Sequence, residues 1–234
     1  SAAIWIFWPE RLARLGWAWF ALDLRGHGAS AADDLAATTM ADHADDVAAL
    51  VRQLAPPPVL MGWSMGGLVA LLAAARGSAE AWIGLAPSPP ARTRGGALPL
   101  RGGTFGAEED GIVSADPADQ PTMPDLDLEE RAVALGALAP ESRLARDDRK
   151  AGIVITGLSC PALIVAGPGD VTFPPPTYAD VPFAADRLEA AGASHWGLVL
   201  NRRVLATLVP AVCAWLEKTT SARPAPSRQS KPCG

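Results

Sequence analysis

Residues 62–66 read Gly-Trp-Ser-Met-Gly and fit the pattern G-x-S-x-G. The apolar residues 59–62 predict a buried strand before the serine, and the Ala/Leu-rich residues 65–76 predict a helix after it. A serine on such a tight turn has strained backbone geometry, and the flanking glycines let neighbouring backbone pass without a clash with a Cβ atom. The turn places the Ser64 Oγ at a helix N-terminus, where the helix dipole favours developing negative charge. The stretch therefore predicts that Ser64 is a nucleophile.

Strands and helices alternate on both sides of this turn. The sequence predicts short strands at residues 18–23, 59–62, 81–86, 161–167 and 187–191. It predicts helices at residues 8–16, 39–54, 65–76 and 197–218. Prolines 56–58 end the second helix, because proline removes a backbone donor, and Pro210 is expected to kink the last one. Such alternation is typical of βαβ units around a mostly parallel, doubly wound sheet.

The alternation is interrupted in the middle of the chain. Residues 88–157 are rich in Gly, Pro and acidic residues, with one helical stretch near 128–138, and we interpret them as a lid inserted over a site. Residues 1–87 and 158–220 then form the α/β core. Residues 221–234 are rich in Pro, Ser and basic residues, so we predict a disordered tail.

The composition narrows the class of protein. The chain has 234 residues, 49% of them hydrophobic and 19% charged, with a formal net charge of −5. This length and apolar content fit one large domain and argue against disorder over most of the chain. The longest dense apolar run, residues 68–75, is far shorter than the ~20 residues of a membrane span, and no signal peptide is recognised. An acidic chain without a Lys/Arg cluster also argues against nucleic acid as a partner.

The sequence indicates no metal and no cofactor. The chain has an odd number of cysteines, and they lack the spacing of metal ligands: Cys160, Cys213 and Cys233. The acidic residues of 108–130 lack regular ligand spacing as well. Because unpaired cysteines are typical of a reducing compartment, we predict a cytoplasmic protein.

Two further polar residues lie in loops that follow predicted strands. A serine hydroxyl is a weak nucleophile and needs a base that is oriented by a carboxylate. His195 lies in a loop of small residues before the last helix, and Asp170 lies in the turn after residues 161–167. Since ligands bind at the carboxyl ends of parallel strands, we expect Ser64, Asp170 and His195 to meet there.

Other histidines and acids compete for these roles. His27 lies in a Gly-rich turn and is interpreted as structural, and His43, within a surface helix, is not expected to be catalytic. Asp180 is an alternative to Asp170 but lies well past the end of the strand. The acids at 147–148 precede the strand and are weaker alternatives.

Four motifs carry a resemblance to a known family. They are DLRGHGAS at 23–30, GWSMGG at 62–67, VAGPGD at 165–170 and SHWG at 194–197. With them the chain resembles the small serine esterases and lipases of the α/β-hydrolase fold, from about residue 5 to residue 218. The resemblance implies that Ser64, Asp170 and His195 are nucleophile, acid and base, in the family's chain order. The stretch GWSMGGLVA is also similar to pimeloyl-carrier-protein methyl ester esterases, which suggests carboxylic ester chemistry.

The oxyanion hole departs from the family's pattern. The resemblance implies that the backbone N–H of Met65, which follows the nucleophile, supplies one donor. In the family a second donor comes from an HG-containing loop after a leading strand. Here the chain begins at Ser1 and reaches a predicted helix by residue 8, so we expect an N-terminal truncation that lacks the leading strands and this loop. Loss of one donor typically costs ~10²–10³ in turnover.

These observations predict a serine esterase. We expect Ser64 to cleave small carboxylic esters or thioesters through an acyl-enzyme intermediate, with a small-molecule ester as the partner. Trp63 and Trp196 flank the nucleophile and base and are candidates to wall an acyl pocket, with packing of the turn as the other interpretation. The sequence does not indicate the acyl-chain length or the oligomeric state.

Two alternative functions stay open. In related enzymes the same triad hydrolyses C–C bonds or performs cofactor-free perhydrolysis, and an arginine that reached the pocket from the lid would favour an anionic substrate. The candidate arginines are Arg92, Arg94, Arg131 and Arg143. From another class, a non-catalytic binding protein with a hydrolase fold is favoured by the missing oxyanion loop and disfavoured by the intact triad.

Overall fold

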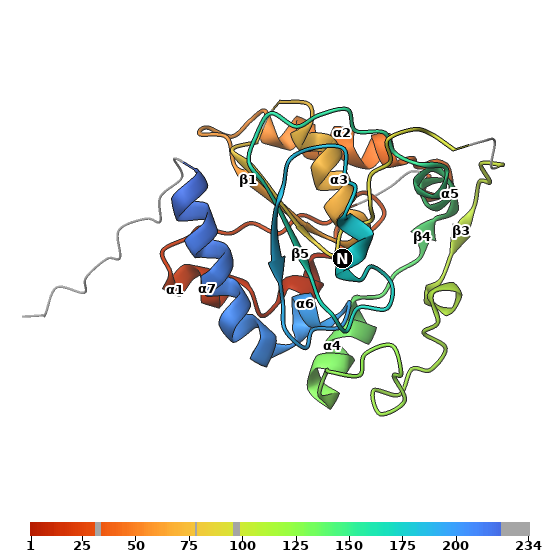
Figure 1. The fold of residues 1–234 in the computed structure, drawn as a ribbon. Helices are drawn as coiled ribbons and strands as arrows, with labels where there is room; N and C mark the ends of the chain where they lie inside the picture. The colour runs from red at the N-terminus through yellow and green to blue at the C-terminus, as the bar shows by residue number, and fades with distance from the viewer. Residues whose placement is uncertain (31–33, 78, 96–98, 221–234) are drawn as a thin grey trace, which may run out of the picture.

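A parallel four-stranded sheet organises the chain, as Figure 1 shows. Its strands follow the order β1-β2-β5-β6 and comprise β1 (Val59–Trp63), β2 (Ala81–Leu85), β5 (Ala162–Ala166) and β6 (Asp186–Glu189). The computed structural model describes residues 1–30, 34–77, 79–95 and 99–220. Gly62 pairs with Gly84, and Leu85 pairs with Val165, so the carboxyl ends of the strands meet at one edge.

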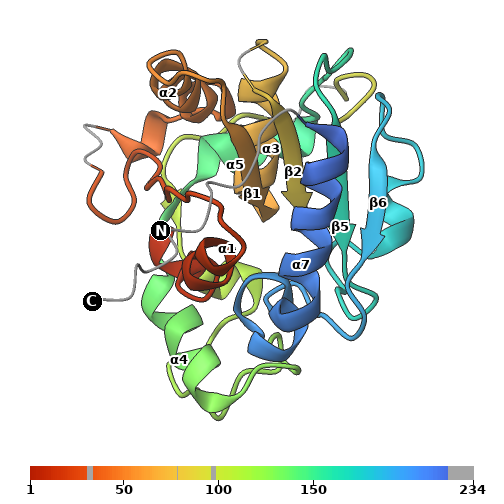
Figure 2. The ribbon, with the colours of Figure 1, turned by 90° about the vertical axis from the view of Figure 1, so that its left-hand side faces the viewer.

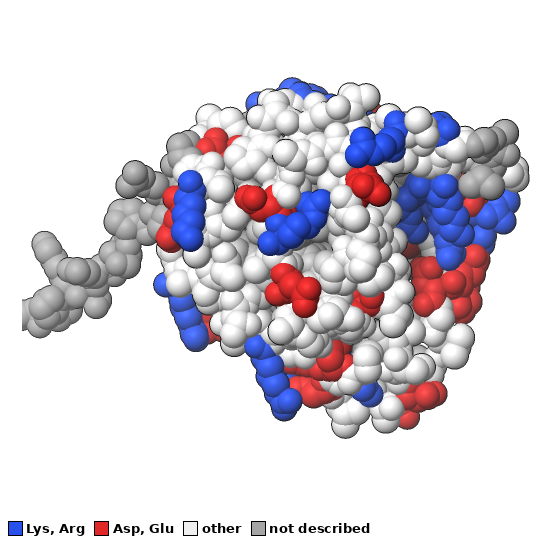
Figure 3. Space-filling view, viewed as in Figure 1, with Lys and Arg blue, Asp and Glu red and all other residues white. Residues whose placement is uncertain are grey.

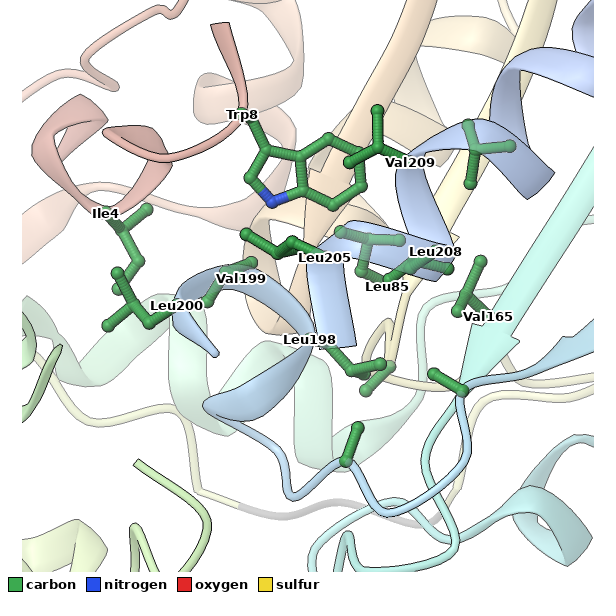
Figure 4. Packing of buried hydrophobic residues seen from close by; sticks show 14 of the residues in the cluster. Ile4, Trp8, Leu85, Val165, Leu198, Val199, Leu200, Leu205, Leu208 and Val209 are labelled. Carbon is green, nitrogen blue, oxygen red and sulfur yellow. The ribbon is translucent and has the colours of Figure 1, made fainter. Parts of the chain in front are cut away.

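Helices cover both faces of this sheet (Figure 2). One face is covered by α1 (Pro9–Arg14), α6 (Gly197–Leu200) and α7 (Arg202–Thr219), and the other by α2 (Met40–Val51) and α3 (Ser64–Ala74). Side chains alternate between the faces because successive residues of a strand point in opposite directions. Leu85 and Val165 belong to the apolar cluster of Trp8 and Leu205 (Figure 4), whereas Trp82 belongs to the cluster of α2 and α3. Both central strands are therefore buried on both faces.

The connection between β2 and β5, residues 86–161, lies outside the sheet. It contains β3 (Thr104–Phe105) paired antiparallel with β4 (Glu141–Ser142), and the helices α4 (Leu128–Ala137) and α5 (Arg143–Ala151). A parallel bridge between Ala91 and Val154 joins its two ends. We call it the β2–β5 connection. It holds the predicted lid, and its role as a lid stays a prediction.

The remaining elements are short. Four 3-10 helices complete the described chain: η1 (Ala2–Trp5), η2 (Leu35–Ala37), η3 (Ala107–Asp110) and η4 (Pro175–Tyr178). No helix among the described residues is long and apolar enough to cross a membrane. The tail predicted at 221–234 lies outside the described residues.

The strand predicted at residues 18–23 does not form. This segment has no strand assignment; Phe20 and Leu22 are 90% and 42% exposed, whereas Trp19 packs on Trp5 and Trp8 with ring centroids 5.3 and 6.3 Å apart. A strand is stabilised by a neighbouring strand that satisfies its backbone groups, and no described strand lies beside this segment. The prediction of a strand from this apolar run is therefore wrong. In the described sheet the edge strand is β1, and residues 18–23 do not pair with it.

The last helix is divided where a continuous one was predicted. It breaks at Asn201, whose side chain accepts hydrogen bonds from the backbone N–H groups of Arg203 and Val204 and so begins α7. Pro210 lies inside α7, and the helix assignment continues through it. The buried face of α7, including Leu205 in Figure 4, holds the helix against the sheet on both sides of the proline.

Candidate active site

Ser64 occupies the turn between β1 and α3. Its φ is +52°, a left-handed conformation that costs free energy for a residue with a Cβ. The N–H of Ser88, in the segment after β2, donates to the Ser64 carbonyl oxygen at 2.9 Å. Ser64 is partly accessible. The strained backbone predicted from the sequence is thus present, and the neighbouring segment holds it in place.

The glycines of this turn have unequal roles. A Cβ on Gly62 would lie 2.2 Å from the Gly66 carbonyl oxygen, so α3 approaches the strand too closely for any side chain there. A Cβ on Gly67 would lie 2.9 Å from the Pro87 Cα. A Cβ on Gly66 would meet no atom within 4 Å. Of the two glycines in the G-x-S-x-G motif, only Gly62 is too closely packed to carry a side chain. Gly67, one residue after the motif, is the other position of this turn where a Cβ would clash.

Asp170 and His195 lie together at the same edge of the sheet. The Asp170 Oδ2 is 2.7 Å from the His195 Nδ1. The Asp170 Oδ1 accepts from the N–H groups of Thr172 and Phe173 at 2.8 and 2.9 Å. Burial raises the pKa of Asp170, but these hydrogen bonds and the imidazole outweigh it, so the pKa lies below its usual value. Asp170 is therefore a buried carboxylate that orients the imidazole through Nδ1.

The turns that carry this pair contact each other directly. The Gly169 N–H, after β5, donates to the Ala193 carbonyl oxygen, after β6, at 3.1 Å. A Cβ on Gly167 would lie 2.1 Å from the same oxygen. The two loops are therefore packed backbone to backbone, which fixes the carboxylate relative to the imidazole.

Aromatic side chains surround the imidazole. The Trp63 Nε1 donates to the His195 carbonyl oxygen at 2.9 Å, and their ring centroids are 4.8 Å apart. Phe173 meets the imidazole edge-on at 5.7 Å. Trp196 packs on Trp63 at 4.8 Å. Trp63, which precedes Ser64 in the chain, thus links the serine turn to the histidine loop. These contacts agree with the interpretation that Trp63 and Trp196 pack the serine turn. That the two tryptophans also form a wall of an acyl pocket stays a prediction.

A carboxylate from the β2–β5 connection supports the histidine loop. The Asp125 Oδ2 accepts from the Ser194 N–H at 3.0 Å, and the Asp125 carbonyl oxygen accepts from the Asn201 Nδ2 at 2.6 Å. A Cβ on Gly197 would lie 1.9 Å from the Asp125 Oδ2. Sequence reasoning missed Asp125, because nothing along the chain relates it to residues about 70 positions away.

The other two histidines lie apart from this pair. The His27 Nδ1 lies 3.0 Å from the Arg25 carbonyl oxygen, and its Nε2 lies 3.1 Å from the Glu141 Oε1. The Glu141 carboxylate raises the pKa of His27. His43 lies on the buried face of α2 and is fully buried, and this burial lowers its pKa. The structure brings neither of them to Asp170.

The alternative acids are engaged elsewhere. Asp147 forms an ion pair with Arg101, with hydrogen bonds of 2.8 Å from Nε and Nη2. Asp148 pairs with Arg94 at 2.6 Å. Asp180 is exposed. Asp170 is the acid that the structure places beside the histidine.

The four candidate arginines of the lid have other partners or face solvent. Arg92 is exposed, and Arg94 pairs with Asp148. Arg131 donates to two backbone carbonyl oxygens, and Arg143 pairs with Glu109. On the face shown in Figure 3, basic side chains around α5 and β3 lie next to acidic ones. In the described chain, none of the four forms a hydrogen bond or ion pair with the serine turn or with His195.

The position of Met65 fits one oxyanion donor. Met65 is the second residue of α3, so its N–H is among those that make no hydrogen bond within the helix. The described residues contain no group of three or more His, Cys, Asp or Glu side chains suited to a metal ion. Ser64 and the Asp170–His195 pair lie at the carboxyl ends of strands of one sheet, and among the described residues no hydrogen bond joins the Ser64 Oγ to the imidazole.

Comparison with known proteins places the chain in a family. A model of the family described as "Alpha/beta hydrolase family" matches residues 1–210. Protein phosphatase methylesterase 1 from Mus musculus is 40% identical over 90 residues, 36% of this chain and 23% of that protein. The same enzyme from Bos taurus is 39% identical over 90 residues, 36% of this chain and 24% of that protein. The match thus spans about a quarter of these relatives.

Solved structures share the fold at low identity. Polyneuridine aldehyde esterase superposes with a TM-score of 0.67 at 18% identity, over 91% of this chain and 94% of that one. A methylesterase from Arabidopsis gives 0.63 at 19% identity, over 92% and 94%. A bromoperoxidase from Bacillus anthracis gives 0.66 at 18% identity, over 93% and 88%.

Proposed function

We propose, from the premise that this chain belongs to the alpha/beta hydrolase family, that it is a serine hydrolase of small carboxylic esters or thioesters. The observation that carries the proposal is the 2.7 Å contact between the buried Asp170 and the His195 Nδ1, at the sheet edge where Ser64 occupies a left-handed turn. Structural neighbours that are esterases and relatives that are methylesterases support ester chemistry.

The proposed reaction has two halves. Ser64 Oγ attacks the ester carbonyl carbon while the His195 Nε2 takes the hydroxyl proton, and the Met65 N–H stabilises the oxyanion. The tetrahedral intermediate collapses, and His195 returns the proton to the departing alcohol or thiol. Water then loses a proton to His195 and attacks the acyl carbon, and His195 gives this proton to the departing Ser64 Oγ, which releases the acid and restores the serine. Asp170 holds the imidazole and stabilises its protonated form throughout.

Hydrolysis of short p-nitrophenyl esters tests the proposal. We expect release of p-nitrophenolate by the wild type and loss of release in Ser64→Ala. Ser114→Ala, a partly accessible serine of the β2–β5 connection, is the matched control and should retain wild-type activity. Equal rates in the wild type and Ser64→Ala, both folded by circular dichroism, would contradict the proposed nucleophile, and no release by either would favour a binding protein.

A further inference from the structure

Arg149 lies in the last turn of α5 and is partly accessible to solvent. Its guanidinium Nη1 donates to the Ser88 Oγ at 3.1 Å. Ser88 is fully buried, and the Arg149 side chain is only partly accessible. Burial lowers the pKa of this arginine, whereas hydrogen-bonded carboxylates raise the pKa values of Arg101 and Arg143. Arg149 therefore sits in an environment that disfavours its charge.

The other arginines of α5 have carboxylate partners. Arg143 pairs with Glu109, and Arg146 pairs with Glu109 and Asp110. Among the residues that the structure describes, no carboxylate lies within 4.0 Å of the Arg149 guanidinium. An arginine has five N–H donors, and the hydrogen bond to the Ser88 Oγ engages one of those of Arg149. The arrangement leaves donors free for an anion that the chain itself does not supply.

Two hydrogen bonds connect Arg149 to the nucleophile. The guanidinium donates to the Ser88 side chain, and the Ser88 N–H donates to the Ser64 carbonyl oxygen at 2.9 Å. Ser88 follows β2 in the chain, at the sheet edge that carries Asp170 and His195. An anionic group held by Arg149 would therefore lie two hydrogen bonds away from the backbone of the serine turn.

We infer that Arg149 binds a carboxylate of the substrate, so that the ester cleaved at Ser64 belongs to a molecule that also carries a free acid group, such as a monoester of a dicarboxylic acid. The inference rests on the proposed function and adds the substrate class to it. The guanidinium fork matches a carboxylate in two parallel hydrogen bonds. Ser88 orients the fork by accepting from Nη1.

Paired substrates test the inference. p-Nitrophenyl monoesters of succinic, glutaric and adipic acid are compared with neutral p-nitrophenyl esters of equal chain length, and the readout is the ratio of their kcat/KM values. In Arg149→Gln we expect this ratio to fall about 10- to 100-fold, mainly through KM, because a hydrogen-bonded charge is lost. Arg149→Lys should recover part of it. Arg94→Gln, an exposed arginine of the same connection, should leave it unchanged. An unchanged ratio in Arg149→Gln would overturn the inference.

A binding measurement separates this inference from the proposed function. Ser64→Ala is titrated with glutarate and with the neutral diamide of the same length, by tryptophan fluorescence or calorimetry. We expect saturable binding of glutarate alone, weakened at least tenfold by adding Arg149→Gln. Neutral ester hydrolysis without glutarate binding would overturn the anion site and leave the esterase intact. Glutarate binding without any ester hydrolysis would retain the anion site and refute the esterase.

Discussion

Substitution of Gly62 by alanine tests how closely α3 packs against β1 at the serine turn. The added Cβ would lie 2.2 Å from the Gly66 carbonyl oxygen, 2.5 Å from the Gly66 carbonyl carbon and 2.7 Å from the Gly67 Cα, against ordinary contacts of 3.4–4 Å. All three are backbone atoms of α3, so no side chain can rotate away. The first turn of α3 must move from β1 by about 1 Å. Such overpacking costs about 1–3 kcal/mol, and a 1 Å misplacement of a reacting group costs about 10²-fold in rate.

Gly66→Ala is the matched control, because its Cβ would meet no atom within 4 Å. Alanine in a helix with compatible backbone stabilises a protein by about 0.4–1 kcal/mol. Urea unfolding and p-nitrophenyl ester hydrolysis are measured for both variants. We expect Gly62→Ala to lose both stability and activity and Gly66→Ala to lose neither. Equal effects of the two substitutions would refute the close approach of α3 to β1.

Three further variants test the surroundings of His195 and the contact between the core and the β2–β5 connection. Asp170→Asn should keep the fold and lower kcat about 10³–10⁴-fold, because the imidazole loses its charged partner; a loss below tenfold would contradict its role. Asp125→Ala should lower the free energy of unfolding by about 1–3 kcal/mol in urea, because it leaves a buried backbone donor unpaired. Glu141→Gln should destabilise the protein by about 1 kcal/mol below pH 6.5, where His27 is protonated in both states. Because Glu141 raises the pKa of His27, the difference in stability between the wild type and Glu141→Gln should shrink as pH rises through the pKa of His27 in the folded protein. Urea unfolding of both proteins from pH 5.5 to 9 measures this difference. A difference that grows with pH would contradict a stabilising contact between Glu141 and His27.

The features predicted correctly from the sequence are those that local pattern determines. The strand, turn and helix around Ser64 follow from an apolar run, two glycines and an Ala/Leu-rich stretch. Asp170 and His195 meet because each follows a parallel strand, and parallel strands end at one edge. The strand at residues 18–23 was wrong, because apolar character alone does not provide a neighbouring strand.

The features that sequence could not predict depend on contacts between distant segments. Gly67 rather than Gly66 is crowded because Pro87, beyond the next strand, lies against it. Asp125 reaches the histidine loop only through the path of the β2–β5 connection. Arg149 was not among the candidate arginines, because its isolation from carboxylates follows from how α5 packs beside Ser88.

Fluorophosphonate labelling followed by peptide mass spectrometry tests the central claim most directly, because only an activated serine reacts readily with this probe. We expect a single modification on the peptide that contains Ser64. We also expect loss of labelling in Ser64→Ala, slowed labelling in Asp170→Asn and unchanged labelling in Ser114→Ala. Labelling of folded protein at another serine, or equal labelling of the wild type and Ser64→Ala, would contradict it.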